Sequence, residues 1–183
     1  MTRIIPREVQ ALMKTLTSVQ AAYVAGFLDG DGSIFVRLKP NAAYKYGFQV
    51  APYIVFFQSA KELDFLRRLQ EMIGIGYVRL RNDGIAELTI GSIKEMRNFV
   101  EQLEPYLILK KRQARLLVQV LELKAKVRSR EDFTELVRLI DKYKSLNYSK
   151  KRKITLERVV QDFMRSGNPV ETCSLAERSR ESG

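Results

Sequence analysis

Two aspartates flanking a glycine, Asp29-Gly30-Asp31, are the residues of this chain best suited to chemistry. They follow an apolar stretch with the small residues Ala25 and Gly26, which predicts a helix ending at the two carboxylates. A helix C-terminus already carries partial negative charge, so carboxylates are unfavourable there. If two such helices pack together, carboxylates about 4 Å apart repel by about 4 kcal/mol at an effective dielectric constant of 20. A divalent cation would offset that repulsion, so the stretch predicts a metal site at a helix–helix contact.

Two absences narrow the chemistry further. The sequence has no histidine and a single cysteine, Cys173, so it cannot build an internal disulfide, a cysteine zinc site or an imidazole metal site. Ser-His and Cys-His nucleophilic catalysis is excluded for the same reason. A metal must therefore be held by oxygen atoms, which favours hard cations such as Mg²⁺.

Composition points to nucleic acid as the partner. The 183 residues carry 32 Lys and Arg against 21 Asp and Glu, a formal net charge of +11. Such a charge favours a protein that binds nucleic acid or an anionic membrane over a basic soluble protein that binds neither. No apolar run approaches the 18 or so residues that span a bilayer, and no signal peptide is recognisable. With one cysteine, the expectation is an intracellular protein of a reducing compartment, either organellar (chloroplast or mitochondrion) or of a prokaryotic cytoplasm.

The periodicity predicts an α+β domain. A helix is expected over 19–28, capped by Thr17 or Ser18, followed by alternating strands over 33–39 and 48–57. Further strands over 76–81 and 85–90 flank a hairpin turn, and helices are expected over 59–73, 92–103, 105–126, 130–145 and 155–165. The order is α-β-β-α-β-β-α with extra C-terminal helices, which predicts an antiparallel four-stranded sheet with helices on one face. Residues 1–17 are expected to form an arm, 18–165 the domain, and 166–183 a disordered tail.

A longer pattern surrounds the two aspartates. Residues Val24 to Gly32 read VAGFLDGDG, and the stretch resembles the LAGLIDADG motif of homing endonucleases, with Val24 for the first Leu and Gly30 for the second Ala. The resemblance covers about residues 20–165 and is closest to the single-motif, homodimeric branch encoded in organellar ribosomal RNA introns. It continues through the segments GSI at 32–34, KPN at 39–41, YK at 44–45, GIGYVR at 74–79, LKKRQA at 109–114, LN at 146–147 and SK at 149–150.

This resemblance implies the homing-endonuclease fold and a metal-dependent active site. Asp31 and the backbone carbonyl of Gly30 are expected to bind Mg²⁺ or Mn²⁺, with two or three ions shared at the centre of the dimer. Gln58 and Lys110 match family positions that orient water and balance charge near the metals, so Asp31, Gln58 and Lys110 are the expected catalytic residues. The chain departs from the family at Glu62, where the family commonly has a basic residue. Whether Lys61 supplies the missing positive charge stays open.

The same resemblance, together with strand alternation, places the nucleic-acid contacts on the outward face of the sheet. Arginine suits guanine there, and Gln or Asn suits adenine. A basic loop near residue 150 is expected to contact phosphates. The expected DNA-binding residues are Phe35, Arg37, Lys39, Asn41, Tyr44, Gln49, Tyr53, Arg79, Arg81, Glu87 and Thr89 on the sheet and its loops, and Ser149, Lys150 and Lys153 in the basic loop.

A single motif supplies half of a two-helix interface, so a homodimer reading a near-palindromic duplex is expected. Val24, Ala25, Gly26 and Phe27 are the expected interface residues. The leading hypothesis is a site-specific endonuclease that cuts both strands of double-stranded DNA. The alternatives are an RNA-binding intron maturase on the same scaffold, for which Asp31 and Lys110 would be dispensable, and a DNA-binding regulator without cleavage.

Overall fold

The described part of this computed structural model comprises residues 14–147 and 154–165. A capping box starts helix α1 (Ser18–Asp31): the Thr17 hydroxyl accepts a hydrogen bond from the backbone N–H of Gln20, and the Gln20 side chain accepts one from the N–H of Thr17. The helix continues three residues further than its apolar stretch predicts, so both aspartates belong to its last turn. Residues Lys14 to Thr17 are anchored before it, since Lys14 Nζ donates to the carbonyl of Glu71 at 2.8 Å.

The sheet has the order β1-β2-β4-β3, and every neighbouring pair is antiparallel. Its register pairs Phe35 with Tyr53 and Lys39 with Gln49, so the residues predicted to point outward share one face. The predicted hairpin turn forms between β3 and β4, where Gly84 takes the left-handed conformation with φ of +77°. The strands are β1 (Gly32–Pro40), β2 (Phe48–Ser59), β3 (Tyr77–Leu80) and β4 (Ile85–Ile90).

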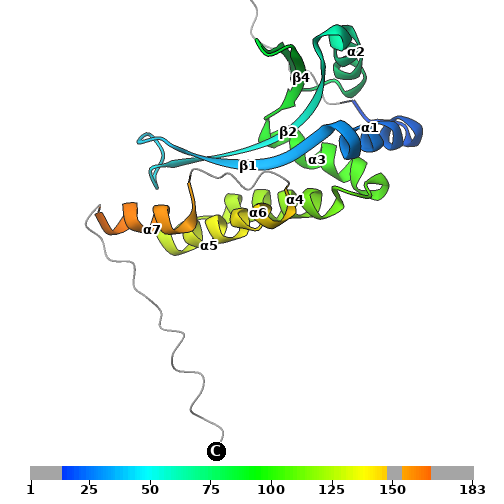
Figure 1. Cartoon of the computed structure of the whole chain (residues 1–183). Coiled ribbons are helices and arrows are strands. Elements are labelled where there is room, and N and C mark those ends of the chain that lie inside the picture. Colours follow the sequence, from blue (N-terminus) through cyan, green and yellow to red (C-terminus); the bar gives the residue numbers. More distant parts are fainter. Residues whose placement is uncertain (1–13, 148–153, 166–183) are drawn as a thin grey trace, which may run out of the picture.

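Helices α4 to α7 lie along one face of the long β1–β2 hairpin, and none of the described helices covers the opposite face of that hairpin (Figure 1). Buried side chains of β1, β2 and β4 meet those of the helices in a single apolar core. The α+β architecture and the predicted element order are therefore confirmed. The remaining helices are α2 (Leu63–Ile73), α3 (Ile93–Leu103), α4 (Lys111–Lys126), α5 (Arg130–Asp141), α6 (Tyr143–Leu146) and α7 (Leu156–Arg165), with short 3-10 turns at η1 (Ala60–Glu62) and η2 (Glu104–Tyr106).

The largest difference from prediction concerns the helix expected over 105–126. It is interrupted: η2 ends at Tyr106, α4 begins only at Lys111, and the residues between them form a loop. Pro52 lies in the part of β2 that has a partner strand on the β1 side alone. The β1–β2 ladder passes through it without interruption, and β4 begins its pairing with β2 only at Ile54. The missing N–H of Pro52 therefore removes no bond between β2 and β4.

Two predicted regions lie outside the described residues: the tail over 166–183 and the basic-loop residues Ser149, Lys150 and Lys153. The same holds for most of the arm over 1–17. Within the described residues, no helix is long and apolar enough to cross a membrane.

Candidate functional site

Asp31 is the last residue of α1, and its side chain is exposed at the start of β1. Because β1 pairs with β2, the side chain of Gln58 reaches it: Gln58 Nε2 donates to Asp31 Oδ2 at 3.0 Å. Among the described residues, Gln58 is the one hydrogen-bond donor to this carboxylate. The other oxygen, Oδ1, therefore remains available to a ligand.

Asp29, by contrast, is 9% exposed and points into the protein. Its carboxylate accepts three backbone N–H bonds from the loop between η2 and α4: from Ile108 at 2.7 Å, Leu109 at 3.1 Å and Lys110 at 2.8 Å. Charge-assisted bonds of this kind are about twice as strong as neutral ones. This set of bonds, the Asp29 clamp, accounts for the interruption of the predicted helix, because the N–H groups bond to Asp29 instead of continuing a helix.

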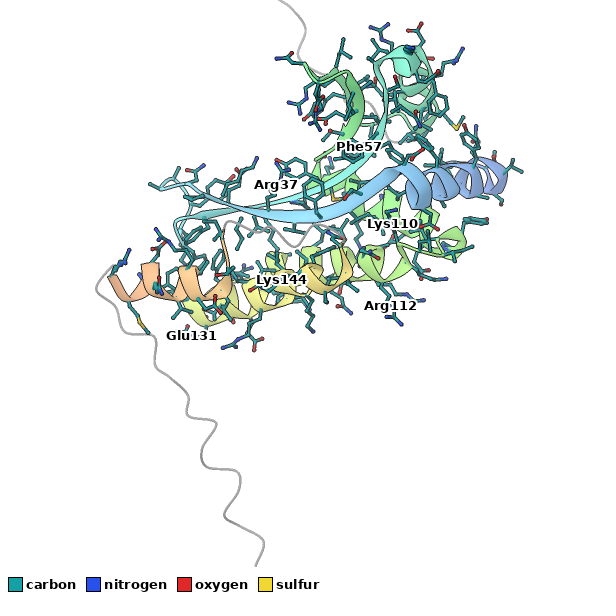
Figure 2. The ribbon with its side chains drawn as sticks, viewed as in Figure 1. Arg37, Phe57, Lys110, Arg112, Glu131 and Lys144 are labelled. Atoms are coloured by element: carbon teal, nitrogen blue, oxygen red, sulfur yellow. The ribbon has the colours of Figure 1, made fainter. Side chains whose placement is uncertain are left out.

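The clamp also places Lys110. Its ammonium donates to the backbone carbonyl of Asp29, at the C-terminal end of α1. A cation there complements the helix dipole. Burial lowers the pKa of Lys110 from its ordinary value, while the nearby charges of Asp29 and Asp31 act in the opposite direction. Figure 2 shows Lys110 between the start of β1 and helix α4.

The oxygen donors at this end of α1 fit a hard divalent cation. Asp31 offers a free carboxylate oxygen, and Gly30 lies in the last helical turn, where backbone carbonyls lack a partner further along the helix. The described residues hold no group of three or more carboxylate, imidazole or thiol side chains close enough to bind a metal.

The outward face of the β1–β2 hairpin carries a cluster of cations and aromatic rings. The Arg37 guanidinium lies 4.9 Å from the ring centre of Phe35 and 5.9 Å from that of Tyr53. Lys39 Nζ lies 5.2 Å from the Tyr53 ring and donates to its hydroxyl at 2.7 Å. Stacking of this kind holds flexible cations in a defined orientation. Gln49 lies beside Lys39 in the register, and its side chain is partly exposed.

The loop at the tip of this hairpin holds two more predicted residues. Asn41 Oδ1 accepts the backbone N–H of Ala43 at 3.0 Å, a local turn that leaves its amide nitrogen free. Tyr44 is 42% exposed beside it. Lys45 donates to the carbonyl of Arg128 at 2.8 Å and so ties the tip to the α4–α5 connection.

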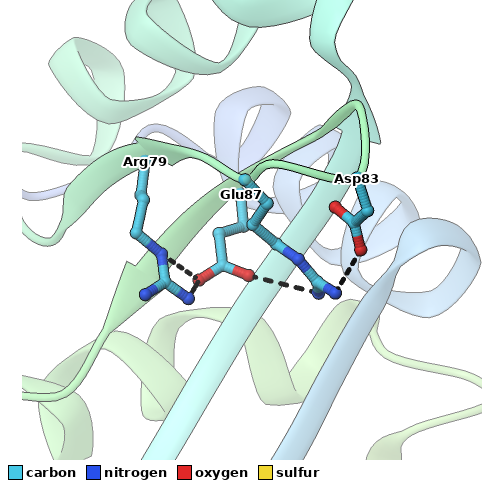
Figure 3. A network of polar contacts seen from close by, with 4 residues as sticks. Arg79, Asp83 and Glu87 are labelled. Carbon is cyan, nitrogen blue, oxygen red and sulfur yellow. Dashed lines mark hydrogen bonds and ion pairs between the residues drawn. The ribbon is translucent and has the colours of Figure 1, made fainter.

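On the β3–β4 hairpin, Glu87 binds both arginines. Arg79 donates to Glu87 Oε1 through Nε at 3.0 Å and Nη2 at 2.6 Å, and Arg81 Nη1 lies 3.7 Å from Glu87 Oε2 (Figure 3). Arg81 also pairs with Asp83 in the turn. Glu87 is 6% exposed, so its carboxylate orients the arginines rather than projecting outward. Thr89, also predicted as a contact, is buried and offers little surface to a ligand.

Two of the four residues predicted for the dimer interface are buried within their own protomer. Val24 and Ala25 have no exposed surface and belong to the core of their own protomer. Phe27 packs mainly inward, against the rings of Phe56 and Phe65. Gly26 is exposed, and a methyl group there would meet nothing within 4 Å among the described residues.

A different face of α1 is free. Val19 is 80% exposed and Tyr23 is 50% exposed, and Gly26 and Gly30 follow at the spacing that keeps all four on one side of a helix. The loop held by the Asp29 clamp adds Ile108 and Leu109, which are 84% and 68% exposed. Sequence reasoning missed Val19, Tyr23, Ile108 and Leu109. The spacing 19, 23, 26, 30 places the helix residues on one side of α1, but it does not tell which side of an apolar helix is buried in the protomer.

Comparisons with known proteins agree with this geometry. A family model described as LAGLIDADG endonuclease matches residues 24–120. The chain is 40% identical over 138 residues to the DNA endonuclease I-CreI of Chlamydomonas reinhardtii, which covers 75% of this chain and 84% of that protein. It is 33% identical over 149 residues to the DNA endonuclease I-CvuI of Chlorella vulgaris, covering 81% of this chain and 92% of that protein.

Solved structures of I-CvuI share the fold. Its crystal structure with its target in the presence of 2 mM Ca aligns with a TM-score of 0.79 at 32% identity, over 84% of this chain and 98% of that one. In a second structure, I-CvuI is bound to the I-CreI target in the presence of 2 mM Mg, and the DNA is not cleaved. It aligns with a TM-score of 0.78 at 32% identity, over 83% of this chain and 97% of that one.

Proposed function

Because this chain belongs to the LAGLIDADG endonuclease family, we propose that it is a site-specific homing endonuclease that hydrolyses both strands of a long, near-palindromic DNA site as a metal-dependent homodimer. The observation that carries the proposal is the free oxygen of Asp31, exposed at the end of α1 with Gln58 and Lys110 at the same place. Arg37 is exposed on the face of the β1–β2 hairpin opposite helices α4 to α7 (Figure 2), and a duplex would bind on this face.

In this reaction the residues of the chain have separate tasks. Gln58 holds one oxygen of Asp31, which fixes the direction in which the other oxygen points. Lys110 brings a positive charge to the end of α1, where charge develops on the phosphate during hydrolysis. A divalent cation bound by Asp31 and the Gly30 carbonyl would polarise the scissile phosphate and lower the pKa of the attacking water. We infer two or three such ions, shared between the protomers.

The second protomer would sit on the free face of α1. Gly26 and Gly30 allow a partner backbone to approach closely, while Val19 and Tyr23, together with Ile108 and Leu109 of the clamped loop, offer apolar surface. This packing would bring two copies of Asp31 together and complete the ligand set that one protomer lacks. The two sheets would then bind the two halves of the site.

The test is a cleavage selection on a library of degenerate near-palindromic duplexes. It compares Mg²⁺ with Ca²⁺, and the unaltered chain with Asp31→Asn. Double-strand cuts at one sequence in Mg²⁺ are expected, with cleavage lost and binding kept in the variant. Selective binding without cleavage in any metal would support the regulator. Enrichment of no DNA at all would contradict the endonuclease and favour RNA as the ligand.

A further inference from the structure

Two rings and two cations on the outward face of the β1–β2 hairpin form one contact network, which we call the ring–cation cluster: Phe35, Arg37, Lys39 and Tyr53. Phe35 and Tyr53 are direct partners in the ladder, and their ring centres lie 5.4 Å apart. Both rings contact the Arg37 guanidinium, whereas Lys39 contacts only Tyr53 within the cluster, through its ring and its hydroxyl. Tyr53 is therefore the member that contacts the other three.

Core packing does not explain the two rings. The apolar core of the described residues contains the strand neighbours Ile34 and Ile54, but neither Phe35 nor Tyr53. Alternation along the strands places the rings on the opposite face, where both are partly exposed. The Tyr53 ring has neighbours on two strands, since Phe35 flanks it on β1, and a Cβ added to Gly91 after β4 would lie 3.5 Å from its Cε1 atom. The ring is thus a fixed support on the outer surface.

The rings hold the cations without neutralising them. Within the described part of the chain, no carboxylate forms an ion pair with Arg37 or Lys39, whereas Glu87 pairs with both arginines of the β3–β4 hairpin. Contact with an aromatic face restricts the orientation of a cation and leaves its charge in place. A long side chain that is already oriented loses less conformational entropy when it binds a ligand. The cluster therefore favours a ligand with acceptors in one defined position.

Both cations also keep hydrogen-bond donors for such a ligand. Among the described residues, Lys39 donates only to the Tyr53 hydroxyl, which uses one of the three N–H groups of an ammonium, and the Arg37 guanidinium donates no hydrogen bond. In the major groove, guanine presents two neighbouring acceptors, O6 and N7, which arginine or lysine binds together. Adenine presents one acceptor beside a donor and suits these side chains less well.

We propose that Phe35 and Tyr53, expected from the sequence to contact DNA themselves, are positioning residues that direct Arg37 and Lys39 toward guanine bases of the target. Tyr53 acts on both cations, through its ring on Arg37 and through its hydroxyl on Lys39. Phe35 acts on Arg37. This inference rests on the proposed function, and it adds that each half-site contains a guanine at the position read by each of the two cations.

The test starts from the duplex obtained in the cleavage selection. Dissociation constants in Ca²⁺ are measured for this duplex and for every single-base-pair variant of its half-site, and their ratio gives the base discrimination at each position. The variants Arg37→Ala and Lys39→Ala identify the position that each cation reads. We expect a guanine at both positions, and discrimination there should fall about fivefold or more in the corresponding variant.

The ring variants then have different expected effects. Phe35→Leu should lower discrimination at the Arg37 position alone, Tyr53→Phe at the Lys39 position alone, and Tyr53→Leu at both. Each loss should be about two- to fivefold, as expected for cation–π contacts at exposed sites. Tyr53→Phe should have no further effect in a chain that already carries Lys39→Ala. Tyr77→Phe, the same change at an exposed tyrosine of β3, is the matched control and should leave both positions unchanged. Melting temperatures establish that each variant is folded.

Three results would overturn the proposal. One is that Tyr53→Phe changes discrimination at a position that neither cation reads, because Tyr53 would then contact a base itself. Another is an equal effect of Tyr53→Phe with and without Lys39→Ala. The third is that the cation variants weaken all duplexes equally, which would place Arg37 and Lys39 on phosphates. If the unaltered chain selects no duplex at all, the proposed function fails and this inference fails with it, whereas the three results above leave the endonuclease intact.

Discussion

At the scale of single residues, the two aspartates of one helical turn have opposite tasks. Asp31 is exposed and keeps a free oxygen, whereas Asp29 is buried and accepts three backbone N–H groups. Their spacing alone explains the difference, since residues two apart in a helix point to different sides. One aspartate can therefore face a ligand while the other holds the loop that carries Lys110.

The substitution Asp29→Asn tests this division. It removes the charge and one of the two acceptor oxygens, and bonds to a charged group contribute about 1.5–3 kcal/mol. We expect a loss of about 2 kcal/mol in the free energy of unfolding, measured by urea denaturation. Asp31→Asn is the matched control on the same helix, and it should leave stability unchanged or raise it by up to about 1 kcal/mol, because it removes a carboxylate from a helix C-terminus. Equal stability of the two variants would contradict the clamp.

Glu87 is a second residue whose task differs from its sequence prediction. Because it binds Arg79 and Arg81, it should act on DNA through them. We expect Glu87→Gln to reduce base discrimination at the positions that the arginines read by about 1–3 kcal/mol. Affinity for random duplex should rise, since one negative charge is lost. A binding selection measures both quantities.

Glu71→Gln, an equal charge change at an exposed position of α2, is the control for this experiment. It should leave base preference unchanged. If Glu87→Gln weakens random and specific duplexes equally and keeps the preference, the orienting task is refuted.

At the scale of elements, the strands and their turns could be predicted because their signals are local. Ile34, Val36 and Leu38 alternate with polar residues and are buried as expected. The turn before β4 follows from Gly84 and its neighbours. The start of α4 could not be predicted, because it depends on Asp29, about 80 residues away in sequence. Leu107 to Lys110 continue a helical pattern and are held as a loop only by that distant carboxylate.

The exposed side of α1 could not be predicted, for another reason. The helix is apolar on nearly all sides, since Val24, Ala25 and Leu28 face the core while Val19 and Tyr23 face out. A pattern without a polar side does not reveal which side is buried in the protomer. Asp31, Gln58 and Lys110, predicted as catalytic residues through resemblance alone, do converge at the end of this helix.

The contact between α4 and α6 gives a prediction on pH. Burial raises the pKa of the Tyr143 hydroxyl from its ordinary value of 10.0. The folded state therefore holds this proton more tightly than the unfolded state, so the contribution to stability is complete below pH 10 and falls as the pH rises above it. We expect unfolding free energies measured from pH 8 to 11 to fall less steeply in Tyr143→Phe.

At neutral pH, Tyr143→Phe should also be about 1 kcal/mol less stable than the unaltered chain, because it loses the bond to the Gln113 carbonyl. Tyr77→Phe, at a position that is 53% exposed, is the control and should follow the unaltered chain throughout. If the free energy of unfolding fell equally with pH in all three proteins, the pH dependence could not be assigned to the Tyr143 hydroxyl.

At the scale of the whole molecule, the charges are separated into two layers. Arg37 lies on the free face of the β1–β2 hairpin, while Arg112 projects from the helix layer on the opposite side (Figure 2). A homodimer doubles a net charge of +11, so duplex affinity should fall steeply with salt. Asp31 and the Gly30 carbonyl, the ligands of the proposed metal site, lie in contrast at the C-terminal end of α1.

Under the proposed function, activity requires a dimer because two copies of Asp31 would form the metal site, and Ile108→Asp tests this proposal. Ile108 is 84% exposed, and its burial against a partner would contribute about 1.5–3 kcal/mol in each protomer. Two charged replacements per dimer should therefore raise the dissociation constant at least 100-fold, as measured by sedimentation equilibrium, and double-strand cleavage should disappear with the dimer. The control is Met164→Asp, which introduces the same charge away from α1, at a residue of α7 that is 58% exposed. It should leave the dissociation constant and double-strand cleavage unchanged. A dimer that persists in Ile108→Asp would mean that another surface joins the protomers, and the two Asp31 carboxylates would then have to meet through a different face of α1.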